Sequence, residues 1–168
     1  AYTGAATMAC SYAGATEVVH VDAARGMVDW AKENMKLSHL ENNKIRFIVD
    51  DCLKFVLREK RRGNKYDAIV MDPPSFGRGP SGEVWKFEEK IMELIHACMD
   101  ILSDTPLFFQ VNAYTTGISE SVLENVMKMS LLKKYPYGSI EADEIGLPIL
   151  NNNLVLPCGI YARWESNE

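Results

Sequence analysis

A short apolar segment that stops at a carboxylate and two prolines constrains the fold of this chain most. Residues 68–71 read Ala-Ile-Val-Met, and Asp72, Pro73 and Pro74 follow directly. A run this short, with two β-branched residues, is typical of a buried strand, and prolines end a strand because they cannot donate to its ladder. The sequence therefore predicts Asp72 at the carboxyl end of a strand, where open α/β sheets bind ligands.

The turn that follows this strand has unusual hydrogen-bonding chemistry. Because prolines lack N–H groups, the turn offers the Asp72 carboxylate and backbone carbonyls as acceptors. Such a turn suits an amine or a ring N–H, and Phe76 stands close enough in sequence to stack on a flat base. The alternative interpretation is a tight turn in which the aspartate accepts only backbone N–H groups.

The same pattern of apolar strand and polar exit recurs along the chain. Strands are predicted at residues 17–22, 44–49 and 106–111, and their exits carry Asp22, Asp50-Asp51 and Asn112. Helices are predicted at residues 5–12, 24–40, 52–62, 87–102 and 118–132. The alternation indicates a mostly parallel sheet covered on both faces, with right-handed crossovers that place every exit on one edge. The extended tails, residues 139–149 and 154–164, predict a closing antiparallel hairpin.

Two loops admit more than one interpretation. Thr3-Gly4 opens a helix with no strand before it, so we expect a C-terminal fragment of a longer chain that lacks the first strand of its sheet; the alternative is a frayed terminus. The glycine-rich residues 77–82 are either a mobile lid over the Asp72 turn or a flexible connection.

Composition indicates one globular domain, residues 1–168. The net charge of −5 provides no global attraction for nucleic acid. The four cysteines are scattered, without a Cys-x-x-Cys motif or a histidine partner, which predicts free thiols in a cytoplasmic protein and no metal site. No signal peptide or apolar run of membrane-spanning length is present, so no membrane association is expected.

The loop at residues 2–4 indicates which class of nucleotide cofactor the chain could bind. A pyrophosphate site needs a Gly-x-Gly-x-x-Gly turn, whereas this loop has one glycine, Gly4, which also argues against a nicotinamide oxidoreductase. A nucleoside without phosphates needs less clearance, and Asp22 stands at the spacing of a ribose-binding carboxylate. Asp51, with Cys52 beside it, is placed to accept from an adenine amino group. The alternative for both aspartates is capping of the following helix.

These segments resemble a known enzyme family. Thr3-Gly4, Val21-Asp22, Asp50-Asp51 and the stretch from Asp72 to Phe76 resemble the ordered motifs of class I S-adenosylmethionine-dependent methyltransferases. Residues 1–4, 21–23, 31–34 and 72–74 more narrowly resemble the catalytic domain of bacterial large-subunit ribosomal RNA methyltransferases. The resemblance covers residues 1 to about 130 and the terminal hairpin, and its specificity comes from the order and spacing of motifs that are individually weak. It implies a Rossmann-like sheet of seven strands, the last antiparallel.

The resemblance also implies roles for individual residues. The cofactor-binding set is Tyr2, Thr3, Gly4, Asp22, Ala23, Asp51 and Cys52, with residues 2–4 at the methionine end, Asp22 at the ribose and Asp51 at the adenine. The catalytic set is Asp72, Pro73, Pro74 and Phe76, in which Asp72 and the proline carbonyls receive the target nitrogen. The reaction implied is in-line attack on the sulfonium methyl from about 3–3.5 Å.

One difference from the wider methyltransferase group, a missing cysteine, bears on which atom of the substrate is methylated. Methylation at cytosine C5 needs a thiolate that adds to the base, and neither the exit after residue 71 nor the exit after residue 111 carries a cysteine. This favours a base nitrogen of ribosomal RNA. The alternatives are a protein side chain, a small-molecule amine, and a cofactor-binding module without turnover.

Overall fold

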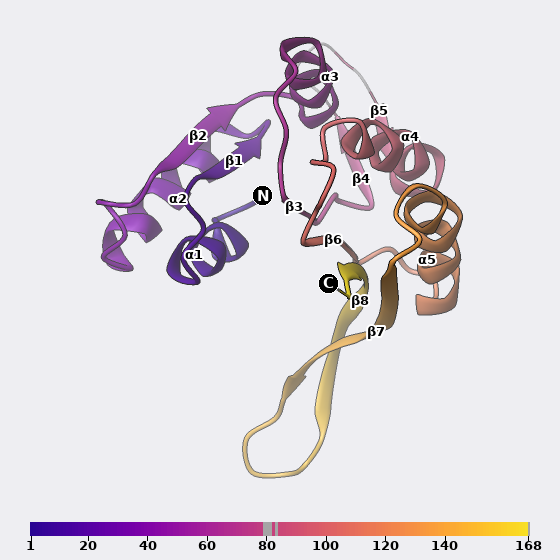
Figure 1. Cartoon of the computed structure of the whole chain (residues 1–168). Coiled ribbons are helices and arrows are strands. Elements are labelled where there is room, and N and C mark those ends of the chain that lie inside the picture. The colour runs from indigo at the N-terminus through magenta and orange to yellow at the C-terminus, as the bar shows by residue number, and fades with distance from the viewer. Residues whose placement is uncertain (79–81, 83, 168) are drawn as a thin grey trace. The chain divides into compact units, whose positions relative to one another are not determined.

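The structure of the protein is a computed structural model that describes residues 1–78, 82 and 84–167 (Figure 1). It consists of two compact units, Ala1–Arg58 and Glu59–Glu168, and the division falls within helix α3 (Cys52–Arg62). Each unit has its own sheet and its own apolar core.

The first unit is built on a parallel pair of strands. Strands β1 (Val18–Asp22) and β2 (Ile45–Val49) pair in parallel from Val18↔Ile45 to Asp22↔Val49. Helices α1 (Ala5–Tyr12) and α2 (Arg25–Leu37) pack against these strands. Helix α2 turns Val28 and Ala31, one helical turn apart, completely away from solvent. A buried hydrogen bond of 2.9 Å between Thr7 Oγ1 and His20 Nδ1 ties α1 to β1.

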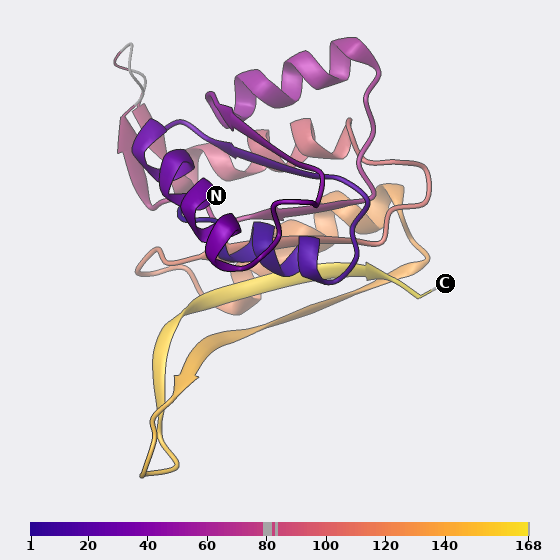
Figure 2. The same cartoon turned by 90° about the vertical axis from the view of Figure 1, so that its left-hand side faces the viewer.

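The second unit contains a four-stranded mixed sheet in the order β3-β6-β8-β7 (Figure 2). Strands β3 (Ala68–Met71) and β6 (Phe108–Ala113) are parallel, whereas β8 (Val155–Ser166) runs antiparallel to β6 and to β7 (Gly138–Pro148). Helix α5 (Glu120–Met127) packs on β7 and β8 and continues as a π-helix, η1 (Lys128–Leu132). Strands β4 (Phe76–Arg78) and β5 (Val84–Lys86) form an antiparallel hairpin that leads into helix α4 (Phe87–Met99).

The architecture confirms the predicted fold class, with parallel strand pairs, intervening helices and an antiparallel terminal hairpin. The β4–β5 hairpin was not predicted: Gly77 and Arg78, assigned to a loop, are paired in β4. Gly82 has a positive φ of 88°, and residues 79–81 of the predicted loop lie outside the described residues.

In two helices, the apolar spacing of the sequence predicts a buried side chain that the structure exposes. Leu57 of α3 is 40% exposed, and Phe55 is buried in its place. Val122 of α5 is exposed as well, while Leu123 and Met127 of the same helix are fully buried. Sequence periodicity fixes which residues share a helix face, but a rotation of the face by one position leaves the apolar pattern almost equally well satisfied.

An aromatic cluster forms the core beneath the terminal hairpin. Trp164 is fully buried, its ring centroid lies 5.5 Å from that of Tyr135 and 5.8 Å from that of Tyr137, and its Nε1 donates to the Tyr135 carbonyl over 3.2 Å. Gly138 of β7 faces the indole so closely that an added Cβ would overlap the ring. Gly138 is therefore required by close approach.

We expect Gly138→Ala to destabilise the protein by about 1–3 kcal/mol, because the added methyl group must displace the indole from a packed core. The measurement is the free energy of unfolding from urea titration. Gly26→Ala is the matched control: Gly26 lies in α2 with no atom within 4 Å of an added Cβ, and the substitution should leave stability unchanged or raise it. Equal stability of the wild type and Gly138→Ala would contradict the packing argument.

Candidate functional site

Three carboxylates, those of Asp22, Asp50 and Asp51, lie at one edge of the first unit. Because β1 and β2 are parallel and in register to their last residues, Asp22 and the Asp50-Asp51 pair end neighbouring strands at the same edge. The Asp50 N–H donates to the Asp22 carbonyl over 3.1 Å and continues the ladder past β2. The strand exits predicted from the sequence therefore meet within this unit.

The Asp22 carboxylate joins three segments. Its Oδ2 accepts from the N-terminal ammonium of Ala1 at 3.0 Å and from the Tyr2 N–H at 2.9 Å, and its Oδ1 accepts from the Ala24 N–H at 2.8 Å. Burial by itself raises the pKa of Asp22, but these hydrogen bonds and the ammonium charge outweigh burial, so the pKa lies below its usual range. Asp22 is held as an anion at neutral pH.

The loop at residues 2–4 has a left-handed backbone that packs on α2. Gly4 has a φ of 90° and Tyr2 a φ of 50°, and a Cβ on Gly4 would lie 3.0 Å from the Ala31 Cβ. The side chain of Asn34 fixes the loop from the same helix by donating to the Thr3 carbonyl over 2.9 Å. Gly4 is thus needed for its backbone conformation and for close approach, the two reasons for which glycine occupies such turns.

The other predicted cofactor residues lie close to this edge. Asp51 Oδ1 accepts from the Lys54 N–H at 2.8 Å and caps α3, so the capping interpretation holds for that oxygen. Cys52 begins α3, with its sulfur 3.8 Å from the Val21 carbonyl. Ala23 is exposed between Asp22 and the start of α2. Contact of these residues with a cofactor stays a prediction.

In the second unit, the diproline turn is held by its neighbours. Asp72 follows β3, whose last residue Met71 is paired with Val111 of β6, so Asp72 stands level with Asn112. The Trp85 Nε1 donates to the Pro74 carbonyl over 2.6 Å. The next residue, Ser75, accepts at its carbonyl from the backbone N–H at the start of α4 (3.0 Å) and bonds through its hydroxyl to Thr115 (3.0 Å). Hydrogen bonds from β5, from the start of α4 and from Thr115, which follows β6, therefore fix the turn.

Phe76 offers an accessible aromatic face beyond this turn. It is 53% exposed, and the Arg78 guanidinium lies 5.8 Å from its ring centroid. An exposed ring beside a cation is suited to stacking on a flat, electron-rich ligand. Trp85 was not singled out from the sequence, since its role depends on the pairing of Gly77 with Trp85 across the hairpin.

Tyr114 belongs to the surroundings of Asp72. Burial raises the pKa of Tyr114, the negative charge of Asp72 raises it further, and a hydrogen bond with Asn112 partly opposes both effects. Cys158 of β8 makes a smaller contribution in the same direction. Gly159 lets the ring lie against β8, because an added Cβ would be 2.6 Å from Tyr114 Cδ1. The sequence gives no local signal for this contact, because it depends on Gly159, which lies far along the chain in β8.

A buried carboxylate anchors the other end of β3. Glu59 is fully buried and accepts from the Tyr66 hydroxyl at 2.7 Å, Asn64 Nδ2 at 2.7 Å and Arg62 at 3.0 Å. Burial raises the pKa of Glu59, but the three donors outweigh burial and the pKa is lowered. Basic residues at the end of α3 therefore take part in ion pairs, since Arg62 binds Glu59 and Lys60 binds Asp100 at 2.8 Å.

Two further searches concern only the described part of the chain. No group of three or more histidine, cysteine or acidic side chains in it is arranged to hold a metal ion. None of its helices combines the length and the apolar character needed to cross a bilayer. All four cysteines are free thiols.

Comparison with known proteins gives a consistent result. A family model described as S-adenosylmethionine-dependent methyltransferase matches residues 1–102. The crystal structure of the SAM-dependent methyltransferase from Agrobacterium tumefaciens superposes with a TM-score of 0.89 at 37% identity, covering 98% of this chain and 53% of that one. The predicted Rossmann-like methyltransferase fold is confirmed.

Two curated relatives are ribosomal RNA enzymes. Ribosomal RNA large subunit methyltransferase I of Aeromonas hydrophila is 30% identical over 133 residues, which are 79% of this chain and 31% of the relative. Ribosomal RNA large subunit methyltransferase K/L of Shewanella pealeana is 40% identical over 75 residues, 45% of this chain and 10% of the relative. The chain thus spans under a third of either relative.

We expect Asp72→Asn to lower the pKa of Tyr114 part of the way to its ordinary value. The carboxylate disfavours the tyrosinate, so removing its charge eases ionisation, while burial still holds the pKa up. The measurement is an NMR titration of ring-labelled tyrosine, with Tyr114→Phe to assign the signal. Asp67→Asn, at the opposite end of β3, is the matched control and should leave the titration unchanged. Identical titrations for both variants would show that Asp72 does not act on Tyr114.

Proposed function

We propose that this chain, which belongs to the S-adenosylmethionine-dependent methyltransferase family, transfers a methyl group to a base nitrogen of ribosomal RNA. The observation that carries the choice of a nitrogen is the Asp72-Pro73-Pro74 turn, which presents a carboxylate and backbone carbonyls and is held rigid from three sides. The names of the curated relatives support ribosomal RNA as the substrate.

The residues of the first unit fit the nucleoside and amino-acid parts of S-adenosylmethionine. A carboxylate has about four acceptor positions, and three donors reach Asp22, which leaves capacity for a ribose hydroxyl. The loop has one glycine at a left-handed position, enough for a close backbone approach but short of the fingerprint for a pyrophosphate. When bound, the cofactor supplies a methyl group activated by its positively charged sulfur.

The residues of the second unit fit an attacking amine. The Pro74 carbonyl already accepts a hydrogen bond from the Trp85 indole N–H. We therefore assign the hydrogen bonds of the amine to the Asp72 carboxylate and the Pro73 carbonyl. These acceptors orient the amine so that its lone pair points away from the turn, and orientation supplies most of the rate in such transfers. As the new N–C bond forms, the nitrogen becomes more acidic and Asp72 is placed to take its proton. Phe76 stacks on the ring that carries the amine.

A ribosomal RNA substrate must be held by local contacts. The chain has a net charge of −5, so no long-range field draws RNA to it as a whole. Stacking on Phe76, with Arg78 beside the ring, provides one such local contact in the second unit. We further propose that the protein acts in the cytoplasm, where ribosomes are assembled.

The test separates cofactor binding from transfer. Calorimetry with S-adenosylhomocysteine should give micromolar affinity for the wild type and for Asp72→Asn, and an affinity weaker by at least about tenfold for Asp22→Ala, since a charge-assisted hydrogen bond is lost. Transfer of labelled methyl groups to ribosomal RNA stripped of its proteins should be lost in both variants. Methylation of protein extract instead of RNA would contradict the substrate. Binding without transfer by the wild type would identify a module without turnover.

A further variant decides between a nitrogen and a carbon target. Attack at cytosine C5 needs a cysteine that adds to the base. Cys158 is the cysteine found in the surroundings of Tyr114 and Asp72. We expect Cys158→Ala to retain transfer within about twofold of the wild type, because a nitrogen target needs no covalent adduct. The measurement is the rate of methyl transfer at saturating cofactor, with Cys98→Ala as the control for a lost thiol. A loss of about a thousandfold in Cys158→Ala alone would contradict the nitrogen target.

A further inference from the structure

The terminal hairpin continues past the sheet that supports it. Strand β6 pairs with β8 only from Phe108↔Glu165 to Ala113↔Ile160, whereas β7 and β8 remain paired out to Pro148↔Val155. Residues 146–159, here called the arm, therefore form a two-stranded ribbon and its turn, which extends beyond the four-stranded sheet (Figures 1 and 2). A two-stranded ribbon is marginal in water unless it packs on something else.

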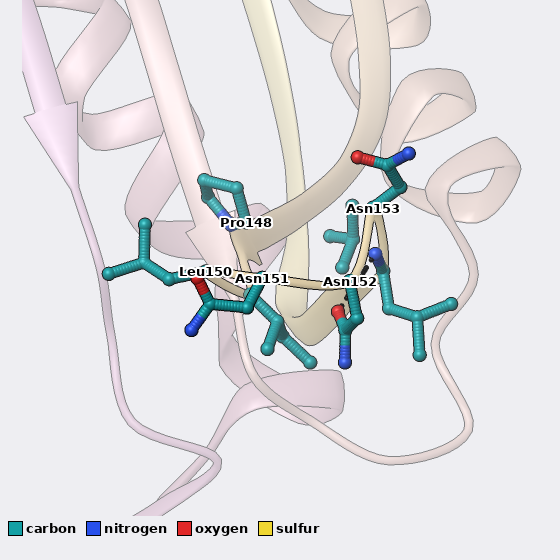
Figure 3. Close-up of a pocket in the computed structure, with 8 residues that line it drawn as sticks. Pro148, Leu150, Asn151, Asn152 and Asn153 are labelled. Atoms are coloured by element: carbon teal, nitrogen blue, oxygen red, sulfur yellow. Dashed lines mark hydrogen bonds between the residues drawn. The ribbon is translucent and has the colours of Figure 1, made fainter.

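The arm has no charged residue. Between Glu144 and Arg163, residues 145–162 contain no Asp, Glu, Lys, Arg or His, although 24% of all residues of the chain are charged. The turn itself is made of Leu150 and three asparagines, of which Asn152 accepts the Leu154 N–H at its Oδ1 over 3.1 Å. Residues 148–155 line an open hollow there (Figure 3). Because that hollow is the inside of the turn, it provides no separate ligand site.

One face of the arm is a continuous aliphatic surface. Leu147 pairs with Leu156, and the Ile149 N–H donates to the Leu154 carbonyl over 2.9 Å, so alternation along both strands places these four side chains on the same face. They are 58%, 53%, 40% and 63% exposed, respectively.

The opposite face and the turn are apolar as well. Val155 is 58% exposed and Leu150 is 84% exposed. The four side chains of the aliphatic face leave on the order of 400 Å² of surface in water, which is the size of the largest patch on a typical monomer and about half of the roughly 800 Å² that each partner buries in a standard interface.

We propose that the arm is a dimerisation element that packs against the arm of a second copy of this chain. An apolar, charge-free face is complementary to itself, and a two-fold axis brings the same patch of both copies together. Nucleic acid is a poor match, since the arm has no cation for a phosphate and the exposed residues are not aromatic.

The charges at the base of the arm limit how the two copies meet. Strand β7 carries Glu141, Asp143 and Glu144 just before the arm begins, and in a two-fold dimer these would face the same residues of the other copy if the strands met along their whole length. Like charges opposed across an interface repel, so the contact is confined to the arm.

The test is sedimentation velocity of the purified chain from low to high micromolar concentration. The wild type should pass from monomer to a species of twice the mass, and Leu154→Glu/Leu156→Glu should weaken this association at least tenfold, because two buried carboxylates would lie in the apolar contact. Val122→Glu is the matched control, since it replaces a side chain of similar exposure on α5, outside the arm. Circular dichroism monitors folding of each variant.

Leu150→Glu keeps the test decisive if the double variant fails to fold. Leu150 lies in the turn, outside the strand ladder and mostly in solvent, so its replacement should leave the fold intact and still weaken the dimer. A wild type that stays monomeric throughout, or a dimer equally stable in the arm variants, would overturn the proposal. So would arm variants that keep their association and lose binding to ribosomal RNA, since that result would assign the arm to RNA.

Discussion

The Asp22 carboxylate is the interaction on which the cofactor-binding part of this protein depends. It ends β1 and accepts the Tyr2 and Ala24 N–H groups, so one side chain links a strand, the loop before α1 and the start of α2. Together with the ammonium group of Ala1, these hydrogen bonds outweigh burial and hold the pKa of Asp22 below its usual range. A cofactor bound at Asp22 would therefore meet a charge and a backbone that are already in position, which reduces the entropy lost on binding.

The diproline turn shows how a rigid site is made by neighbours distant in sequence. Two prolines restrict the backbone from Asp72 onward, but the restriction alone does not orient the carbonyls. Trp85, the start of α4 and Thr115 do so through hydrogen bonds to Pro74 and Ser75. The β4–β5 hairpin thus supports the diproline turn through Trp85, and it also places Phe76 next to that turn.

The elements and the site differ in how far they could be predicted. Helix α3 and strand β3 begin and end at the predicted residues, because an aspartate cap, a glycine after the helix and two prolines after the strand are local signals. The hairpin β4–β5 was missed, since its three-residue strands lack a period long enough to detect. Burial of Glu59 was also missed, because its partners Arg62, Asn64 and Tyr66 gather around it only when α3 packs beside the start of β3.

The sequence by itself determined the order of most strands and helices, the aspartates at the ends of β1, β2 and β3, and the resemblance to methyltransferases, since period, cap and proline signals act over a few residues. Only the tertiary structure decided which atoms each site residue binds. Asp51 caps a helix, and the Pro74 carbonyl accepts a hydrogen bond from the Trp85 indole. The ring of Tyr114 can lie against β8 near Asp72 because Gly159 has no side chain. It also decided that the apolar tail becomes an exposed arm, because β6 stops at Ala113 while β7 and β8 remain paired beyond it. Contacts between segments that are distant in sequence leave no pattern in the local sequence, so they became known only from how the chain packs.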